Sequence, residues 1–173
     1  ARVDDPDGVS SLTLRYRLDP SATLTTLAMN DAGNGGDAVA GDGIFSATIP
    51  GQAQGALVAF QVQAIDGLGQ GASFPASATS GECLVRFGEP TPVGNIPVYR
   101  IWMTQASFNA WSSANKLGNA AYDVTFVSGN ARAIYNTEAQ YAGSPYISPG
   151  YNNPAGNRCG YSIGFPKDDL FLG

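Results

Sequence analysis

Residues 11–19 read SLTLRYRLD, and apolar and polar side chains alternate along this stretch. The leucines and the tyrosine fall on one face, whereas the threonine and the two arginines fall on the other. Alternation with a period of two is typical of a β-strand that has one buried and one exposed face. Residues 57–66, LVAFQVQAID, alternate in the same way. The two stretches therefore predict strands of a β-rich fold.

Turn residues separate further short strands within residues 1–88. Shorter strand patterns occur at residues 23–29, 44–50 and 83–87. The chain has 22 glycines and 11 prolines among 173 residues, with 43% hydrophobic and 13% charged residues, so it can bury a core. Turns at intervals of roughly 8 to 15 residues are typical of a β-sandwich of the immunoglobulin or fibronectin type III kind. We therefore expect a mostly β protein whose residues 1–88 form such a sandwich.

The second part of the chain, residues 98–173, has a different pattern. Three prolines and two glycines precede it, and they predict a linker at residues 89–97. Thr104 is predicted to cap the start of a helix and Gly118 to end it. We expect a smaller α+β segment that is cut short at its end. Its elements are a strand (98–103), a helix (104–118), a β-hairpin (122–136), a long loop (142–160) and a last strand (161–165).

Charge and composition exclude several classes of function. The formal net charge is −5, the nine Lys and Arg residues are scattered, and histidine is absent. Nucleic-acid binding needs clustered basic residues, so no nucleic-acid partner is expected. No apolar run reaches the roughly 18 to 20 residues that a membrane span needs. The lack of histidine excludes Ser-His-Asp and Cys-His catalysis and the usual zinc sites.

Cys83 and Cys159 are the two cysteines of the chain, and they lie far apart in the sequence. Their spacing excludes a CxxC redox or zinc motif. A long-range disulfide in an oxidising compartment is one interpretation, and two buried free thiols are the other. Cys83 falls on the apolar phase of its predicted strand, which favours a position in the core.

Residues 29–50 read MNDAGNGGDAVAGDGIFSATIP, and glycines and aspartates are concentrated in their first half. The stretch lacks the lysine of a phosphate-binding P-loop and the ligand spacing of an EF-hand. Asp31, Asn34, Asp37 and Asp42 nevertheless offer four side-chain oxygens, and calcium accepts irregular oxygen ligand sets. The alternative is a glycine-rich loop in which aspartate side chains accept hydrogen bonds from the backbone. Both interpretations stay open at this point.

Tyrosines are frequent in the second part of the chain, and five of them lie in or near its loops. Aromatic rings on loops can stack on sugars or peptides. Packing within the protein is the alternative interpretation. The residues concerned are Tyr135, Tyr141, Tyr146, Tyr151 and Tyr161.

Two stretches of the first part, GDAVAGDGIF and VAFQVQAIDGLG, resemble the immunoglobulin-like modules of large secreted bacterial proteins. The second part resembles the beginning of CotH-type kinase-like domains, a family named for a spore-coat protein. This resemblance is carried by IPVYRIWMTQASFNAW (96–111), YDVTFVSGNARAIYN (122–136), AGSPY (142–146) and NRCGYSIGFPKDDLFLG (157–173). Together the two resemblances cover most of the chain.

Kinase members of that family phosphorylate protein serines with ATP and a divalent metal. The resemblance implies that Arg158 and Lys167 lie near the nucleotide, although this chain lacks the family's arginines before AGSPY. A kinase also needs metal-binding carboxylates and a catalytic base, which would lie downstream of residue 173. We therefore expect no catalysis from the chain as given. ATP and a divalent metal are implied only for a longer parent protein.

The sequence leads to three hypotheses about function. The first is a non-catalytic piece of a secreted or cell-surface bacterial protein, in which a sandwich acts as a spacer or adhesion unit before a CotH-like domain. The second is the N-terminal portion of an ATP-dependent protein kinase. The third is a carbohydrate-binding module. The expected partners are other domains of the same or a longer chain, and a protein or glycan ligand.

Overall fold

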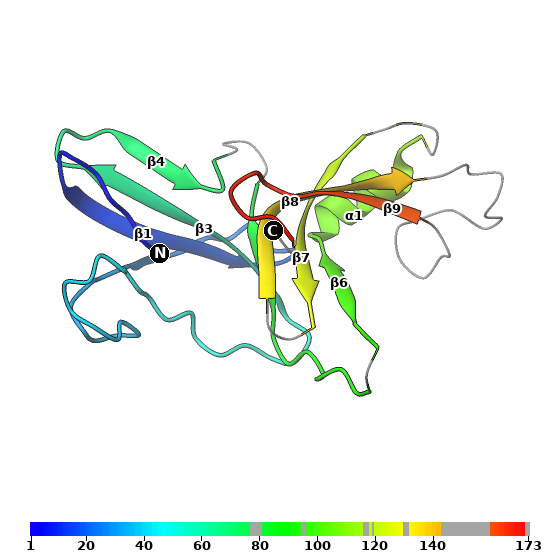
Figure 1. Ribbon diagram of the computed structural model, residues 1–173, viewed down its shortest axis with the longest axis horizontal. Helices are drawn as coiled ribbons and strands as arrows, with labels where there is room; N and C mark the ends of the chain where they lie inside the picture. The colour runs from blue at the N-terminus through cyan, green and yellow to red at the C-terminus, as the bar shows by residue number, and fades with distance from the viewer. Residues whose placement is uncertain are drawn as a thin grey trace.

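The computed structural model describes residues 1–76, 81–94, 96–115, 118, 120–129, 132–142 and 160–171. Their architecture is mostly β, with two antiparallel sheets and one short helix, which confirms the predicted fold class. Figure 1 shows the first sheet and the second sheet at opposite ends of the molecule, with the helix beside the second sheet. No helix in the described part of the chain is long and apolar enough to cross a membrane.

The first sheet has the two predicted long strands at its centre. Strand β1 (Val9–Leu18) pairs with β2 (Thr25–Ala28) on one edge and with β3 (Leu57–Asp66) on the other. Strands β4 (Gly71–Phe74) and β5 (Cys83–Arg86) share the free edge of β3, each pairing with a different part of it. All strands that the structure describes within residues 1–88 therefore belong to one five-stranded sheet, so these residues do not form the second sheet of the predicted sandwich.

The apolar face of this sheet is covered by the irregular segment between β2 and β3. Leu14, Tyr16 and Val58 form the buried centre, and Ala47 and Ile49 of the covering segment pack against them. This segment runs below β1 and β3 in Figure 1. The strand predicted at residues 44–50 is wrong, because the segment makes only two isolated bridges and no continuous ladder. Ala47 and Ile49 of this stretch still pack into the core, whereas Ile44 is 44% exposed.

The second sheet has the order β6-β7-β8-β9. Its strands are β6 (Tyr99–Trp102), β7 (Tyr122–Ser128), β8 (Arg132–Ala142) and β9 (Gly160–Gly164). Strands β7 and β8 form the predicted hairpin. Strand β8 continues to residue 142, beyond the predicted end of the hairpin, because β9 pairs with its second half.

Helix α1 (Gln105–Ser113) packs on one face of the second sheet. Thr104 caps its start as predicted, since its side chain accepts a hydrogen bond from the Ser107 backbone N–H. The prediction that the helix ends at Gly118 is wrong. The backbone becomes extended at Ala114, whose N–H donates to the Trp111 carbonyl and so closes the last turn.

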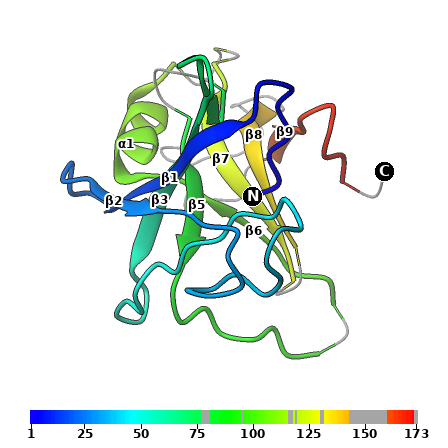
Figure 2. The same ribbon diagram turned by 90° about the vertical axis from the view of Figure 1, so that its left-hand side faces the viewer.

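The two sheets are in contact through β5. Figure 2, in which the first sheet faces the viewer, shows β5 beside β7. The Leu84 side chain is 1% exposed, and Thr125 of β7 is fully buried. Strand β5 therefore pairs with β3 in one sheet and packs against the other sheet.

Candidate functional site

The acidic loop brings three of its four predicted ligands together. One carboxylate oxygen from each of Asp31, Asp37 and Asp42 lies within 4.8 Å of the others. Asp37 is 8% exposed, whereas Asp42 is exposed. The fourth residue, Asn34, is exposed, and its Nδ2 donates to the carbonyl of Ala32 at 3.4 Å. The described ion pairs include none with these three carboxylates, so the cluster has no cationic side-chain partner there.

Backbone N–H groups surround the Asp31 carboxylate. Its Oδ1 accepts from Gly41 at 2.8 Å and from Asp42 at 3.2 Å, and its Oδ2 accepts from Gly43 at 2.9 Å. Asp37 Oδ2 accepts from the Gly33 N–H at 2.6 Å. Carboxylates that accept several backbone hydrogen bonds hold a loop in one conformation. Asp31 and Asp37 therefore cap the loop backbone, as the second interpretation expects, and calcium binding stays a prediction.

Glycine is required in this loop for a steric reason. Gly36 has a φ of +106°, a backbone conformation that L side chains rarely adopt. A Cβ at this position would also lie 2.6 Å from Thr48 Oγ1. The close approach places the loop against Thr48, which lies between Ala47 and Ile49, the two residues that pack on the first sheet.

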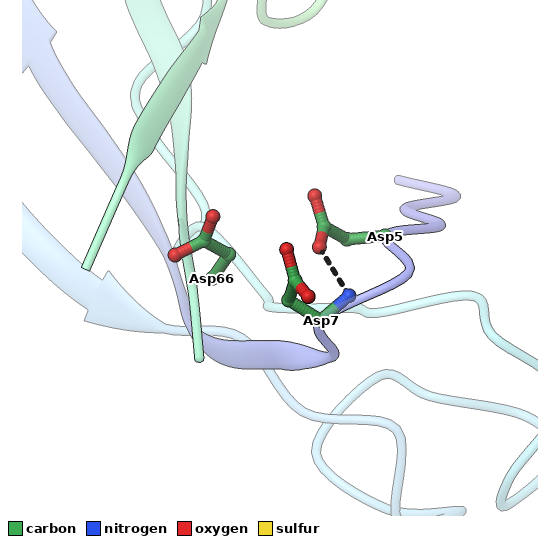
Figure 3. A group of neighbouring side chains, drawn as sticks. All are labelled: Asp5, Asp7 and Asp66. Atoms are coloured by element: carbon green, nitrogen blue, oxygen red, sulfur yellow. Dashed lines mark hydrogen bonds between the residues drawn. The ribbon is translucent and has the colours of Figure 1, made fainter. Parts of the chain in front are cut away.

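A second acidic cluster, absent from the sequence prediction, consists of Asp5, Asp7 and Asp66 (Figure 3). Asp5 Oδ1 accepts from the Asp7 N–H at 2.8 Å. Asp66 Oδ1 accepts from Leu68 and Gln70 at 2.9 and 2.7 Å. The only sequence signal for this cluster was the run of aspartates near the start of the chain. Asp66 is distant in the sequence, and the pairing of β1 with β3 brings it beside Asp5 and Asp7. The hydrogen bonds of Asp5 and Asp66 stabilise local turns.

A cavity of about 760 Å³ lies between the start of α1, strand β6 and the first sheet. Asp19, Arg86 and Gln105 contribute polar groups, and Asp19 Oδ2 accepts from the Gln105 N–H at 2.8 Å. Concave apolar walls with a few polar groups are typical of ligand pockets. Its aromatic lining residues are Tyr99, Trp102, Phe108, Phe126 and Tyr161. Sequence patterns missed this cavity because its walls come from distant segments.

All three described tyrosines from the predicted loop region pack within the protein. Tyr141 and Tyr161 lie against Trp111, with ring centroids 5.0 and 5.8 Å from it. Tyr135 packs edge to face on Phe60 at 5.6 Å. The packing interpretation is confirmed for these three rings, and Tyr161 also lines the cavity. Tyr146 and Tyr151 lie outside the described residues.

Cys83 is a buried free thiol beside Tyr135. Burial raises the pKa of the Cys83 thiol from 9.0 to about 12. Burial also raises the pKa of the Tyr135 hydroxyl, and the nearby charge of an ionised Cys83 raises it further. Cys159 lies outside the described residues, and Cys83 carries a free thiol, so the structure shows no disulfide at Cys83.

Cys83 is expected to make the protein less stable at alkaline pH. The folded state holds the thiol proton more tightly, so this contribution is complete below pH 9.0 and is lost as the pH rises toward about 12. The free energy of unfolding should fall by up to about 1.4 kcal/mol for each pH unit in that window. Urea unfolding between pH 8 and 11, compared with Cys83→Ala, measures the effect. If the free energy of unfolding had the same pH dependence in the wild type and in Cys83→Ala, the prediction would be contradicted.

Of the two nucleotide-proximal residues implied by the family resemblance, the structure describes only Lys167. Lys167 is exposed in a turn after β9, and Arg158 lies outside the described residues. The ATP site of a longer parent therefore stays a prediction.

Comparison of the chain with protein-family models, with curated proteins and with solved structures found no match in any of the three. The resemblances to immunoglobulin-like modules and to CotH-type domains stay predictions. A function for this chain is therefore inferred from its own residues.

Proposed function

We propose that the chain is a rigid, non-catalytic module of a secreted or cell-surface bacterial protein, where it serves as a spacer or adhesion unit. The buried joint between the two sheets carries the proposal. The Leu84 N–H donates to Thr125 Oγ1 at 3.0 Å in a buried setting. Phe60 of β3 packs on Tyr135 of β8. A spacer needs this kind of joint, because it keeps one end of the module oriented relative to the other.

A polar network supports the joint at the end of β1. The Arg17 guanidinium forms ion pairs with Asp19 and with Glu82, which precedes β5. These two carboxylates raise the pKa of Arg17, with the Glu82 hydrogen bond as the largest cause. Asp19 also accepts the hydrogen bond from the first residue of α1, Gln105. The network therefore connects the first sheet to the helix of the second segment.

The predicted linker forms ion pairs with both sheets. Glu89 forms ion pairs with Arg86 of β5 and with Arg100 of β6, each at 3.2 Å. Arg100 also donates to the carbonyls of Pro90 and Gly129, at 2.9 and 2.8 Å. These contacts support a fixed connection between the two segments.

The two segments are expected to unfold together. The chain has two tryptophans, Trp102 and Trp111, and both belong to the second segment, whereas far-UV circular dichroism detects both sheets. Urea transitions followed by the two signals should coincide, as they do for a single cooperative unit. Two separate midpoints would indicate modules on a flexible hinge and would overturn the proposal of a rigid spacer.

The aromatic cavity favours a second candidate function, binding of a glycan or protein ligand. Tyr99 is 52% exposed and stacks on Phe126, with 5.6 Å between the ring centroids. Exposed aromatic faces beside a few polar groups suit sugar rings. A glycan array probed with the whole chain tests this candidate, with Tyr99→Ala as the comparison. The absence of any signal would remove it.

Calcium binding is a further proposal for the acidic loop. It is supported by the convergence of Asp31, Asp37 and Asp42 and by the burial of Asp37. Hard oxygen ligands of this type suit calcium, and each carboxylate has lone pairs beyond those used by the backbone N–H groups. The ion would stabilise the loop and would take no part in chemistry.

Calcium is expected to raise the melting temperature, because an ion that binds only the folded state stabilises it by about 2.7 kcal/mol at 100 times its Kd. Thermal melts with calcium and with a chelator measure the shift. Asp42→Asn keeps an acceptor for the Ile44 N–H but removes a charge, so it should reduce the shift. Asp7→Asn, in the other acidic cluster, is the matched control. A melting temperature that does not change when calcium is removed would contradict the proposal of a calcium site.

The kinase hypothesis concerns a longer parent protein. It rests on the resemblance of residues 96–173 to CotH-type domains. A phosphorylation assay of the full parent with labelled ATP and a divalent metal tests it, and a parent without activity would remove it.

A further inference from the structure

A second cavity, of about 320 Å³, lies where β5 meets the second sheet. It is lined by Arg86 of β5, by Arg100 of β6 and by Arg132 of β8, together with Glu89, Trp102 and Tyr135. Three of the nine basic residues of an acidic chain therefore line one cavity. The arginines lie far apart in the sequence, so this concentration of positive charge is produced by the docking of the sheets.

Acidic residues compensate only part of the charge. Glu89 pairs with Arg86 and Arg100, and Asp169 pairs with Arg132. Among the described residues, three guanidinium groups thus face two carboxylates. A concave site with an excess of positive charge attracts anions.

Two of the arginines keep donors for a ligand. The described contacts of Arg86 all involve Nε, and those of Arg132 all involve Nη2. Within the described ranges, no hydrogen bond is made by the Nη1 and Nη2 groups of Arg86 or by Nη1 of Arg132. The planar guanidinium offers paired donors that match the oxygens of carboxylate, sulfate and phosphate groups.

Trp102 is a further lining residue of the cavity. Its Nε1 is buried and has no hydrogen-bond partner among the described residues. The indole N–H can only donate, and leaving a buried donor unsatisfied costs free energy.

We propose that this cavity binds the oxyanion group of a ligand, that is, a carboxylate, a sulfate or a phosphate. Arg86 and Arg132 bind the anion through their remaining donors. Arg100 is a positioning residue, because Glu89 and the carbonyls of Pro90 and Gly129 hold it in place. The site depends on both sheets, since Arg86 comes from the first sheet and the other two arginines come from the second.

Calorimetric titration of the whole chain with sodium sulfate, sodium phosphate and sodium acetate tests the proposal. The ionic strength is kept constant, so that general screening does not differ between titrations. Saturable binding of at least one anion is expected. Binding of sulfate or phosphate without acetate identifies a tetrahedral oxyanion, and the reverse result identifies a carboxylate.

Arg86→Gln and Arg132→Gln should each weaken binding by roughly tenfold or more, because each removes a charge-assisted contact. Their side chains are 48% and 42% exposed, so both variants are expected to fold. Arg15→Gln makes the same charge change on the polar face of β1 and should alter the Kd less than twofold. The proposal is overturned if none of the three anions binds saturably, or if Arg15→Gln weakens binding as much as the cavity variants do.

Discussion

Replacement of Trp111 by alanine is expected to lower the free energy of unfolding by about 3–5 kcal/mol. Trp111 is 1% exposed and connects α1 to the second sheet through Val124, Ala139 and Tyr141. Its ring stacks on Tyr122 at 5.4 Å. Alanine would leave a cavity at the centre of this cluster. Urea unfolding followed by circular dichroism measures the loss.

Trp111→Phe is the control for that experiment. The Trp111 Nε1 has no hydrogen-bond partner in the described part of the chain, so phenylalanine keeps an aromatic ring and loses no hydrogen bond seen there. It should therefore destabilise the protein by less than half as much as alanine does. If both variants were as stable as the wild type, α1 would not be anchored by this side chain.

Leu84→Ala is expected to cost about 2–5 kcal/mol, the range for a fully buried leucine. Leu84 is buried in β5, the strand that joins the two sheets, and its N–H donates to Thr125 Oγ1. The loss should reduce the stability of both sheets together, because they share this contact. Urea unfolding followed by tryptophan fluorescence and by circular dichroism measures it.

Leu68→Ala provides the matched comparison, because the Leu68 side chain is 73% exposed in a turn. An exposed substitution of this kind is expected to change stability by less than about 0.5 kcal/mol. A Leu84→Ala protein as stable as Leu68→Ala would contradict the buried joint. Two separated transitions in the Leu84 variant would show that the joint is what couples the sheets.

Local sequence patterns predicted the elements that local physics controls. The alternation at residues 11–19 and 57–66 matches β1 and β3, and Thr104 caps α1. The errors arose where tertiary contacts decide. Residues 44–50 alternate like a strand but cover a sheet face without a continuous partner, and α1 ends before Gly118.

The same distinction between local sequence patterns and tertiary contacts applies to the candidate sites. Asp31, Asp37 and Asp42 lie close together in the sequence, so their convergence in one loop was predictable from spacing. The cluster of Asp5, Asp7 and Asp66 was missed because strand pairing brings its last member to the first two. The arginine-lined cavity was missed for a similar reason, since its charges looked scattered along the chain.

The sequence by itself determined a mostly β protein with an acidic loop. It also determined the two long strands of the first sheet and the hairpin of the second sheet. These features follow from alternation, turn residues and capping, which act over short distances. Only the tertiary structure decided that β5 joins the two sheets and that three arginines line one cavity. Such features depend on which buried surfaces meet, and packing between distant segments leaves no period in the sequence. The joint and the cavity therefore exist only in the folded chain.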